Sequence, residues 1–170
     1  TVSFTNIITN DLVTSTATVD TSTLSTGGKP IAGSYTQTAG SLASTDSSNY
    51  SLVGGFTSGS NYTINPLALT GAAITSGSST YGASQNMGTL SFTNKITGDV
   101  VTTASVTILS GVNSTSGNLK AGTYKQTVLG TLSGDDGANY TFTGGFTTLT
   151  NNYTVNQLAL TGAAISGSSS

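Results

Sequence analysis

The sequence contains no histidine, cysteine or tryptophan, and it has very few charged residues. Its 170 residues include four lysines and six aspartates, with neither arginine nor glutamate. General acid–base and nucleophilic catalysis rest mainly on His, Cys, Glu and activated Ser or Lys side chains. Three of these residue types are missing, and no Ser and Lys stand in a paired placement. We therefore predict that the chain is not an enzyme.

The same absences narrow the choice of fold and partners. Without cysteine there is no disulfide framework, so apolar burial and backbone pairing must stabilise the fold. No run of about 18 apolar residues occurs, so we expect no membrane span. A net charge of −2 with four scattered lysines argues against a nucleic-acid partner, which needs a basic surface.

Small hydroxyl residues and strand formers dominate what is present. Threonine and serine make up about a third of the chain, and Val, Ile, Tyr and Phe recur along it. Branched and aromatic side chains fit the pleated surface of a strand, whereas strong helix formers are scarce here. A disordered chain would combine low hydrophobicity with high net charge. The composition therefore predicts a folded, all-β protein.

One sequence unit occurs twice. Residues 67–74 (LALTGAAI) return unchanged as residues 158–165. The spacing between the copies grows along the unit from 88 to 91 residues, which single-residue insertions in loops explain. The other recurring pairs of segments are 3–6 with 91–94, 33–38 with 122–127, 49–50 with 139–140, 54–57 with 144–147, and 61–65 with 152–156.

The recurrence divides the chain into three parts: an incomplete first repeat at residues 1–66, a complete repeat at 67–157, and the start of a third repeat at 158–170. We expect the chain to be a segment cut from a longer array. A period near 90 exceeds the roughly 20–50 residues of common solenoid and propeller repeats. It suits a small β domain. The predicted fold is all-β, with tandem β-sandwich-like or β-grasp-like repeat domains of about 90 residues forming an elongated rod or filament.

Strand-forming runs alternate with turn signals inside the complete repeat. One such turn signal is the run Ser-Gly-Ser-Ser at residues 76–79. Gly144 and Gly145, inside a strand pattern, indicate a bulge or a tight crossing. The predicted strands are residues 67–74, 89–93, 100–109, 123–129, 140–148 and 152–155.

Aromatic side chains must supply much of the core, because other apolar residues are scarce. We expect the recurring tyrosines to pack in cores or corners with the hydroxyl bonded to backbone. These are Tyr35, Tyr50, Tyr62, Tyr124, Tyr140 and Tyr153. The expected core aromatics of the complete repeat are Phe92, Tyr124, Tyr140, Phe142 and Phe146.

The order and spacing of several motifs resemble a known family. They are residues 138–141 (ANYT), 152–155 (NYTV), 158–163 (LALTGA) and 81–82 (YG), with earlier matches at 49–51 and 61–67. This order resembles the MBG/YDG-type tandem repeats of large bacterial exoproteins, including filamentous-haemagglutinin-like adhesins of two-partner secretion. Ala83 departs from the pattern, since the family often has an aspartate after Tyr-Gly or within a Tyr-Asp-Gly triplet.

The resemblance implies a structural stalk of a secreted or cell-surface bacterial adhesin or biofilm-matrix filament, and it carries over no catalytic residue. The implied partners are neighbouring repeats, self-assembly into a filament, and an extracellular polysaccharide or a host or cell-surface ligand. A glycan- or protein-binding adhesive module is the alternative, and it would require an exposed aromatic or apolar patch.

The ends of the chain carry a further hypothesis. The first repeat lacks the strand that begins Leu-Ala-Leu-Thr, and residues 158–170 hold an unpaired copy of it. A strand given to a neighbouring chain would complete that neighbour by β-strand addition. Within one long polypeptide, the same pairing would run along the chain instead.

Four other features of the sequence are candidate sites. Asp135 and Asp136 form the only adjacent carboxylate pair and are weak calcium candidates, with a polar turn tip as the favoured reading; no metal or cofactor is expected. An isopeptide bond is disfavoured because the chain has no Glu.

The Thr-rich run at residues 14–23 favours a solvent-facing strand edge over an ice- or polysaccharide-binding face. The sequons at Asn49, Asn61, Asn113, Asn139 and Asn152 favour turn-closing side chains over glycan acceptors.

Overall fold

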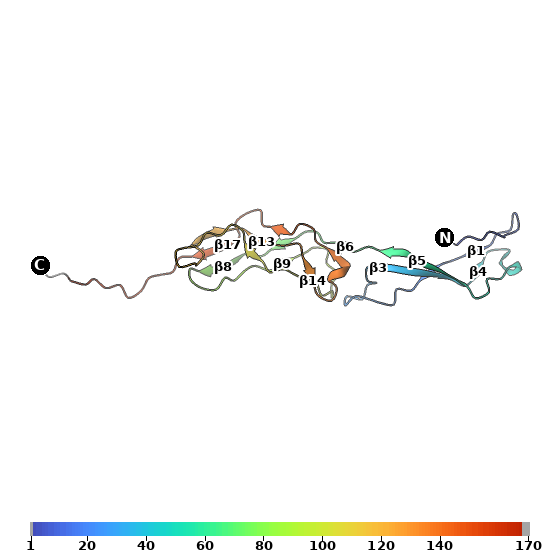
Figure 1. Ribbon diagram of the computed structural model, residues 1–170, viewed down its shortest axis with the longest axis horizontal. Coiled ribbons are helices and arrows are strands. Elements are labelled where there is room, and N and C mark those ends of the chain that lie inside the picture. The colour runs from blue at the N-terminus through green and yellow to red at the C-terminus, as the bar shows by residue number, and fades with distance from the viewer. Residues whose placement is uncertain (1, 168–170) are drawn as a thin grey trace. The chain divides into compact units, whose positions relative to one another are not determined.

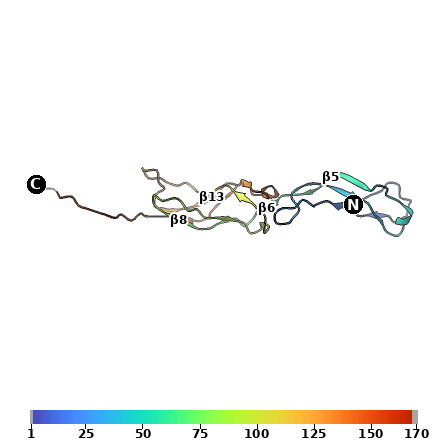
Figure 2. The same cartoon turned by 90° about the horizontal axis from the view of Figure 1, so that it is seen from below.

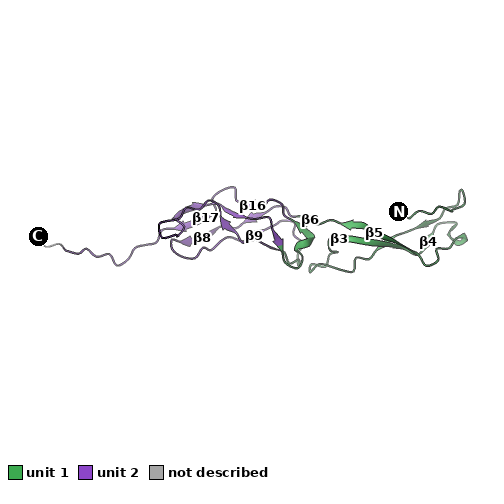
Figure 3. Cartoon of the chain, in the orientation of Figure 1, with its two compact units in different colours: residues 1–68, 96–101, 133–141 green, residues 69–95, 102–132, 142–170 purple. Residues whose placement is uncertain are grey.

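The computed structural model describes residues 2–167 and shows an all-β protein. In this range the helical elements are two 3₁₀ turns, Ser47–Asn49 and Gly137–Asn139. No helix in the described chain has the length and hydropathy needed to cross a bilayer. Two compact units form (Figure 3). The first comprises Thr1–Ala68, Ile96–Val101 and Ser133–Thr141, and the second Leu69–Lys95, Thr102–Leu132 and Phe142–Ser170.

The first unit is built on a long antiparallel pair. Strands β3 (Gly33–Ala39) and β5 (Phe56–Ile64) run side by side in both views (Figure 1, Figure 2). Strand β2 (Thr18–Val19) pairs with the other edge of β3, so the sheet order is β2-β3-β5. Alternate residues of β3 face inward, as a strand period of two requires. The remaining strands are β1 (Thr14–Ser15) with β4 (Leu42–Ala43), antiparallel, and β6 (Leu67–Ala68) with β15 (Tyr140–Thr141), parallel.

The second unit holds two three-stranded sheets. In one, β17 (Tyr153–Asn156) lies between β12 (Gly122–Tyr124) and β8 (Gly77–Thr80). In the other, β13 (Gln126–Val128) lies between β11 (Thr107–Ile108) and β16 (Phe146–Thr147). The shorter strands are β7 (Ala73–Ile74), paired with β9 (Leu90–Ser91), then β10 (Thr102–Thr103), and β14 (Leu132–Ser133), which reaches the boundary of the unit.

Two small apolar clusters form the core of the second unit. One gathers around Ile74, Val128 and Phe142, where the ring of Phe92 meets that of Phe142 edge to face with centroids 4.9 Å apart. The other gathers around Leu119, Tyr153 and Val155. The expected role of the aromatic residues is confirmed here, since Phe92, Phe146 and Tyr124 all pack against these clusters. Tyr140 is buried in the first unit.

Each predicted strand contains paired backbone, but in shorter pieces. The predicted strand at 67–74 is broken between β6 and β7 at Gly71, whose φ is +63°. The prediction of a turn at 76–79 is wrong, because β8 occupies Gly77–Thr80 and pairs in parallel with β17. A Cβ at Gly77 would lie 2.9 Å from Cδ2 of Tyr153. Glycine is therefore needed for close packing, and the local turn signal loses to this tertiary pairing.

The pair Gly144 and Gly145 crosses close to a neighbouring strand. Both residues have left-handed φ values, +81° and +71°. A Cβ at Gly145 would collide with the Val128 carbonyl oxygen, whereas a Cβ at Gly144 would meet open space. The tight crossing predicted for this pair is confirmed.

This difference makes a matched test of core packing. Gly144→Ala should cost about 1–2 kcal/mol for the left-handed backbone alone. Gly145→Ala should cost roughly a further 1–3 kcal/mol, because the methyl group also displaces the Val128 carbonyl. Urea denaturation of both variants measures the difference. Equal losses in the two variants would contradict the close approach.

Candidate functional site

Two aspartates and a tyrosine tie distant segments together inside the first unit. The Tyr140 hydroxyl donates to the Asp99 carboxylate and accepts the N–H of Ile96 at 3.1 Å. The N–H of Val100 donates to Asp136 at 2.7 Å, and the Asp136 N–H donates back to the Val100 carbonyl at 3.0 Å. We call Asp99, Asp136 and Tyr140 the carboxylate–tyrosine cluster.

The same cluster recurs in the first sequence copy. The Tyr50 hydroxyl donates to Asp11 at 2.7 Å and accepts the N–H of Ile8 at 3.0 Å. The N–H of Leu12 donates to Asp46 at 2.8 Å. Asp11, Asp46 and Tyr50 thus take the places of Asp99, Asp136 and Tyr140. The sequence held a signal for this role, because both aspartates recur with their neighbours, but sequence reasoning missed it.

Among the described residues, the carboxylate–tyrosine cluster of the complete repeat also accepts hydrogen bonds from the repeat before it, which the cluster around Tyr50 does not. Gly27 N–H donates to Asp99 Oδ1 at 2.7 Å, and Thr26 N–H donates to Asp136 Oδ1 at 3.1 Å. A third bond runs from the Ala32 N–H to Asn139 Oδ1 at 2.8 Å. These contacts leave Asp99 and Asp136 only 4% and 3% exposed. Backbone N–H groups, together with the Tyr140 hydroxyl, therefore satisfy these two buried carboxylates.

Glycine at position 27 is what allows this approach. A Cβ at Gly27 would press on the Asp99 carboxylate and would lie 2.8 Å from the Thr97 carbonyl oxygen. Real Cβ atoms do not come this near to backbone oxygen, so any other residue would push the two segments apart. Gly27 is thus the residue that lets the first copy dock on Asp99.

The cluster shifts two ionisation equilibria. The N–H of Val100 and then the bonds from Thr26 lower the pKa of Asp136, against the opposing effects of burial and of the Asp99 charge. Burial, followed by the hydrogen bond to Asp99, raises the pKa of Tyr140 to about 12. The cluster therefore favours an ionised Asp136 beside a neutral Tyr140.

The weak calcium candidates have different surroundings. Asp136 is buried and both its oxygens accept backbone N–H groups, whereas Asp135 is exposed. Among the described residues, no three Asp, Glu, His or Cys side chains gather as a metal-ion group. The predicted turn tip is confirmed in part, since a 3₁₀ turn begins at Gly137.

The turn-closing role predicted for the sequon asparagines is wrong at three positions. Asn139 Oδ1 bonds to Ala32, Asn152 bonds to Gln126 and to the Ile74 carbonyl, and Asn61 bonds to Gln37. Each bond joins segments far apart in the sequence. Thr14 and Thr18 do lie on exposed faces, and β2 is a sheet edge, as predicted for that run.

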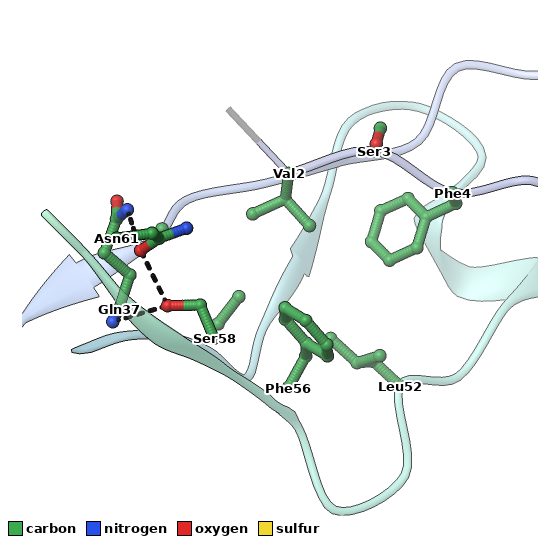
Figure 4. Close-up of a pocket in the computed structure, with 10 residues that line it drawn as sticks. Val2, Ser3, Phe4, Gln37, Leu52, Phe56, Ser58 and Asn61 are labelled. Carbon is green, nitrogen blue, oxygen red and sulfur yellow. Dashed lines mark hydrogen bonds between the residues drawn. The ribbon is translucent and has the colours of Figure 1, made fainter.

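An open apolar groove lies in the first unit (Figure 4). Its volume is about 290 Å³, and its apolar wall includes Val2, Phe4, Leu52 and Phe56. At one end of the groove, Gln37 Nε2 donates to Asn61 Oδ1 at 2.8 Å. Phe56 is 60% exposed. An apolar surface of this kind, rimmed by polar groups, is typical of a binding site.

The two copies of one recurring tyrosine, Tyr62 and Tyr153, differ in how deeply the side chain is buried. Tyr153 is fully buried and its hydroxyl accepts the Asn86 N–H, as predicted for a recurring tyrosine. Its counterpart Tyr62 is 43% exposed, so the prediction of a packed role is wrong there. In the second unit β8 covers Tyr153, and residues 2–66 contain no strand that pairs with β5 in that way. Recurrence predicts burial only in a completed copy.

Comparisons with protein-family models, curated proteins and solved structures find no match for the chain.

The raised pKa of Tyr140 predicts a loss of stability in alkali. Folding favours the neutral phenol, so this stabilisation is complete below about pH 10 and disappears as the pH rises through about 12. Tyr140→Phe should flatten this decline, whereas Tyr50→Phe, at the more exposed counterpart, should flatten it less. Denaturant unfolding at a series of alkaline pH values measures both. A Tyr140→Phe curve parallel to that of the wild type would refute this account.

Proposed function

We propose that the chain is a structural stalk segment of a secreted or cell-surface bacterial adhesin or biofilm-matrix filament. Tandem β-sandwich-like or β-grasp-like repeats would join end to end into an elongated rod, and neighbouring repeats of the array are its main partners. The motif order that resembles MBG/YDG-type repeats supports the class of protein and its extracellular location. The all-β structure agrees with this class.

The observation that carries the proposal is the way one sequence copy is bonded to the next. Asp99, Asp136 and Asn139 of the complete repeat accept N–H groups of Thr26, Gly27 and Ala32 of the first repeat. No flexible linker stands between the copies, because β5 ends at Ile64 and β6 begins at Leu67. A stalk needs short joints of this kind, since a long flexible linker would let the array coil.

A glycan- or protein-binding module is the second candidate, and the groove beside Phe56 favours it. Exposed aromatic rings are common in such sites. Glycan-array screening of the chain, with Phe56→Ala as the control, separates this candidate from the stalk. Binding that is lost in Phe56→Ala would favour the module, and no binding would leave the groove to another occupant.

The extracellular role is tested in the source cells. Antibodies raised against the 170-residue chain should label surface filaments or the surrounding matrix in electron micrographs of unpermeabilised cells, because a stalk segment must lie outside the cell. Labelling only after permeabilisation would overturn the proposal. Cells from which the gene has been deleted provide the control.

The hydrogen-bonded contact between the two repeats should make the chain stiff. Small-angle X-ray scattering of the monomeric chain should fit an elongated particle, with roughly 30–50 Å of length for each complete repeat. Gly27→Ala should broaden the distribution of lengths, because its Cβ would break the contact with Asp99.

Gly28→Ala is the matched control. Its Cβ would meet open space, so this substitution lacks the collision, and its φ of +75° adds a backbone strain that Gly27→Ala does not have. Equal scattering from the two variants would show that the bond between Gly27 and Asp99 does not hold the joint.

A further inference from the structure

The segment at residues 67–74 completes the core of the second unit. Leu69, Ala72 and Ile74 pack into the cluster formed by Val128 and Phe142. The edge of this segment is held by backbone bonds, since β7 pairs with β9 and the Thr93 N–H donates to the Thr70 carbonyl at 3.0 Å. The segment is therefore both an apolar filler and an added strand.

The side-chain amides of Gln126 and Asn152 hold the end of that segment. Asn152 Nδ2 donates to the Ile74 carbonyl at 3.0 Å, and Gln126 Nε2 donates to the Thr75 carbonyl at 3.0 Å. Gln126 and Asn152 also bond to each other at 2.9 Å, and Gln126 is 0% exposed. The pair acts as a clamp on the carbonyl groups of the inserted strand.

The first unit carries the same receiving surface without the strand. By the sequence recurrence, Ala39, Leu52 and Phe56 stand where Val128, Phe142 and Phe146 stand, and all three line the open groove. Gln37 and Asn61 repeat the clamp, with their mutual bond already formed. In Figure 4 both amides lie at one end of the groove, and Val2 and Phe4 lie above Phe56 and Leu52. No strand within residues 2–167 fills this groove as residues 69–74 fill the second unit.

Within the described residues, a second copy of residues 67–74 lies unpaired. Residues 158–165 have the same sequence as residues 67–74 and follow β17 as an extended, exposed segment (Figure 1). Leu160 and Ile165, the counterparts of Leu69 and Ile74, are 92% and 100% exposed. Gly162 has φ +67°, close to the +63° of Gly71. The free segment therefore already holds the bend that the inserted segment uses.

We propose that the groove of the first unit binds the segment at residues 158–165 of a second copy of this chain. Leu160 and Ile165 fill the space beside Leu52 and Phe56, and the Ile165 carbonyl accepts a bond from Asn61 Nδ2. Because donor and acceptor lie on different parts of the chain, each copy donates to the next and the assembly grows head to tail. This inference deepens the proposed stalk function on which it rests, because it names the segment and the surface by which one repeat joins the next.

Sedimentation velocity over a concentration series tests the proposal with three forms of the whole chain. The wild type should form head-to-tail oligomers that grow with concentration. Ile165→Asp should weaken association by at least about 100-fold, because it would place a charge in the apolar groove. Ala164→Asp should associate like the wild type, since Ala73, its counterpart, is exposed in the second unit. Both positions are exposed in the single chain, so neither variant threatens folding.

A peptide of residues 157–167 gives an independent measurement. With a fluorescent label it should bind to the Ile165→Asp chain, whose groove is intact, and Asn61→Ala in that chain should weaken binding about tenfold. The same peptide with aspartate in place of isoleucine should not bind.

Three results would overturn the proposal. The first is a monomeric wild type to which the peptide does not bind. The second is association that persists unchanged in Ile165→Asp. The third is a wild-type monomer whose amides at residues 2–6 are protected from hydrogen exchange and lose protection in Ile165→Asp, because the chain would then fill its own groove. None of these results touches the stalk proposal, which surface labelling and the scattering of monomers test separately.

Discussion

The arrangement of the first unit depends on two carboxylates that each bond to two repeats. One oxygen of each carboxylate accepts a hydrogen bond from its own repeat, and the other accepts one from the preceding repeat. In Asp99 one oxygen receives the Tyr140 hydroxyl of its own copy, and the other receives the Gly27 N–H of the preceding copy. Asp136 divides its bonds between Val100 and Thr26 in the same way. Backbone N–H groups and the Tyr140 hydroxyl thereby hold two like charges in one cluster, in a chain with only four lysines.

Scarcity of apolar residues explains why the core of the second unit depends on one short segment, residues 69–74. The larger cluster of the second unit has only Ile74, Val128 and Phe142 as buried members. Without Ile74 and Leu69, the rest would be left as open as the groove beside Phe56. A unit of this kind buries its apolar face only where a segment equivalent to residues 69–74 is in place.

The sequence predicted what depends on local pattern. Composition predicted an all-β protein, and Gly144 and Gly145 predicted a close crossing of strands, both of which the structure confirms. The aromatic positions predicted the core of the second unit. Local sequence did not predict the backbone conformation where a strand far along the chain determines it. At Gly77 a turn was expected, but pairing with β17 makes this segment a strand.

The polar roles were the hardest to predict. Gln126 lies in a strand like many exposed glutamines, and only its contacts with Thr75 and Asn152 show why it is buried. Asn139 is equally ambiguous from its sequence, because its partner Ala32 is 107 residues away. Tyr62 shows the opposite failure, since its pattern matches Tyr153 but the covering strand is missing. In each case the missing information is a contact in space.

The loop around Gly27 has a counterpart that differs in one residue that matters. The turns at Ser25 and Ser114 carry the same backbone bonds, with Ser25 N–H donating to Lys29 and Ser114 N–H donating to Asn118. Ser116 therefore stands where Gly27 stands, and its side chain bears the Cβ that has no room beside Asp99. Repeats that look equivalent in sequence are thus not interchangeable modules. Shuffling them by recombination would preserve every core and still misfit the joints, so their order carries structural information.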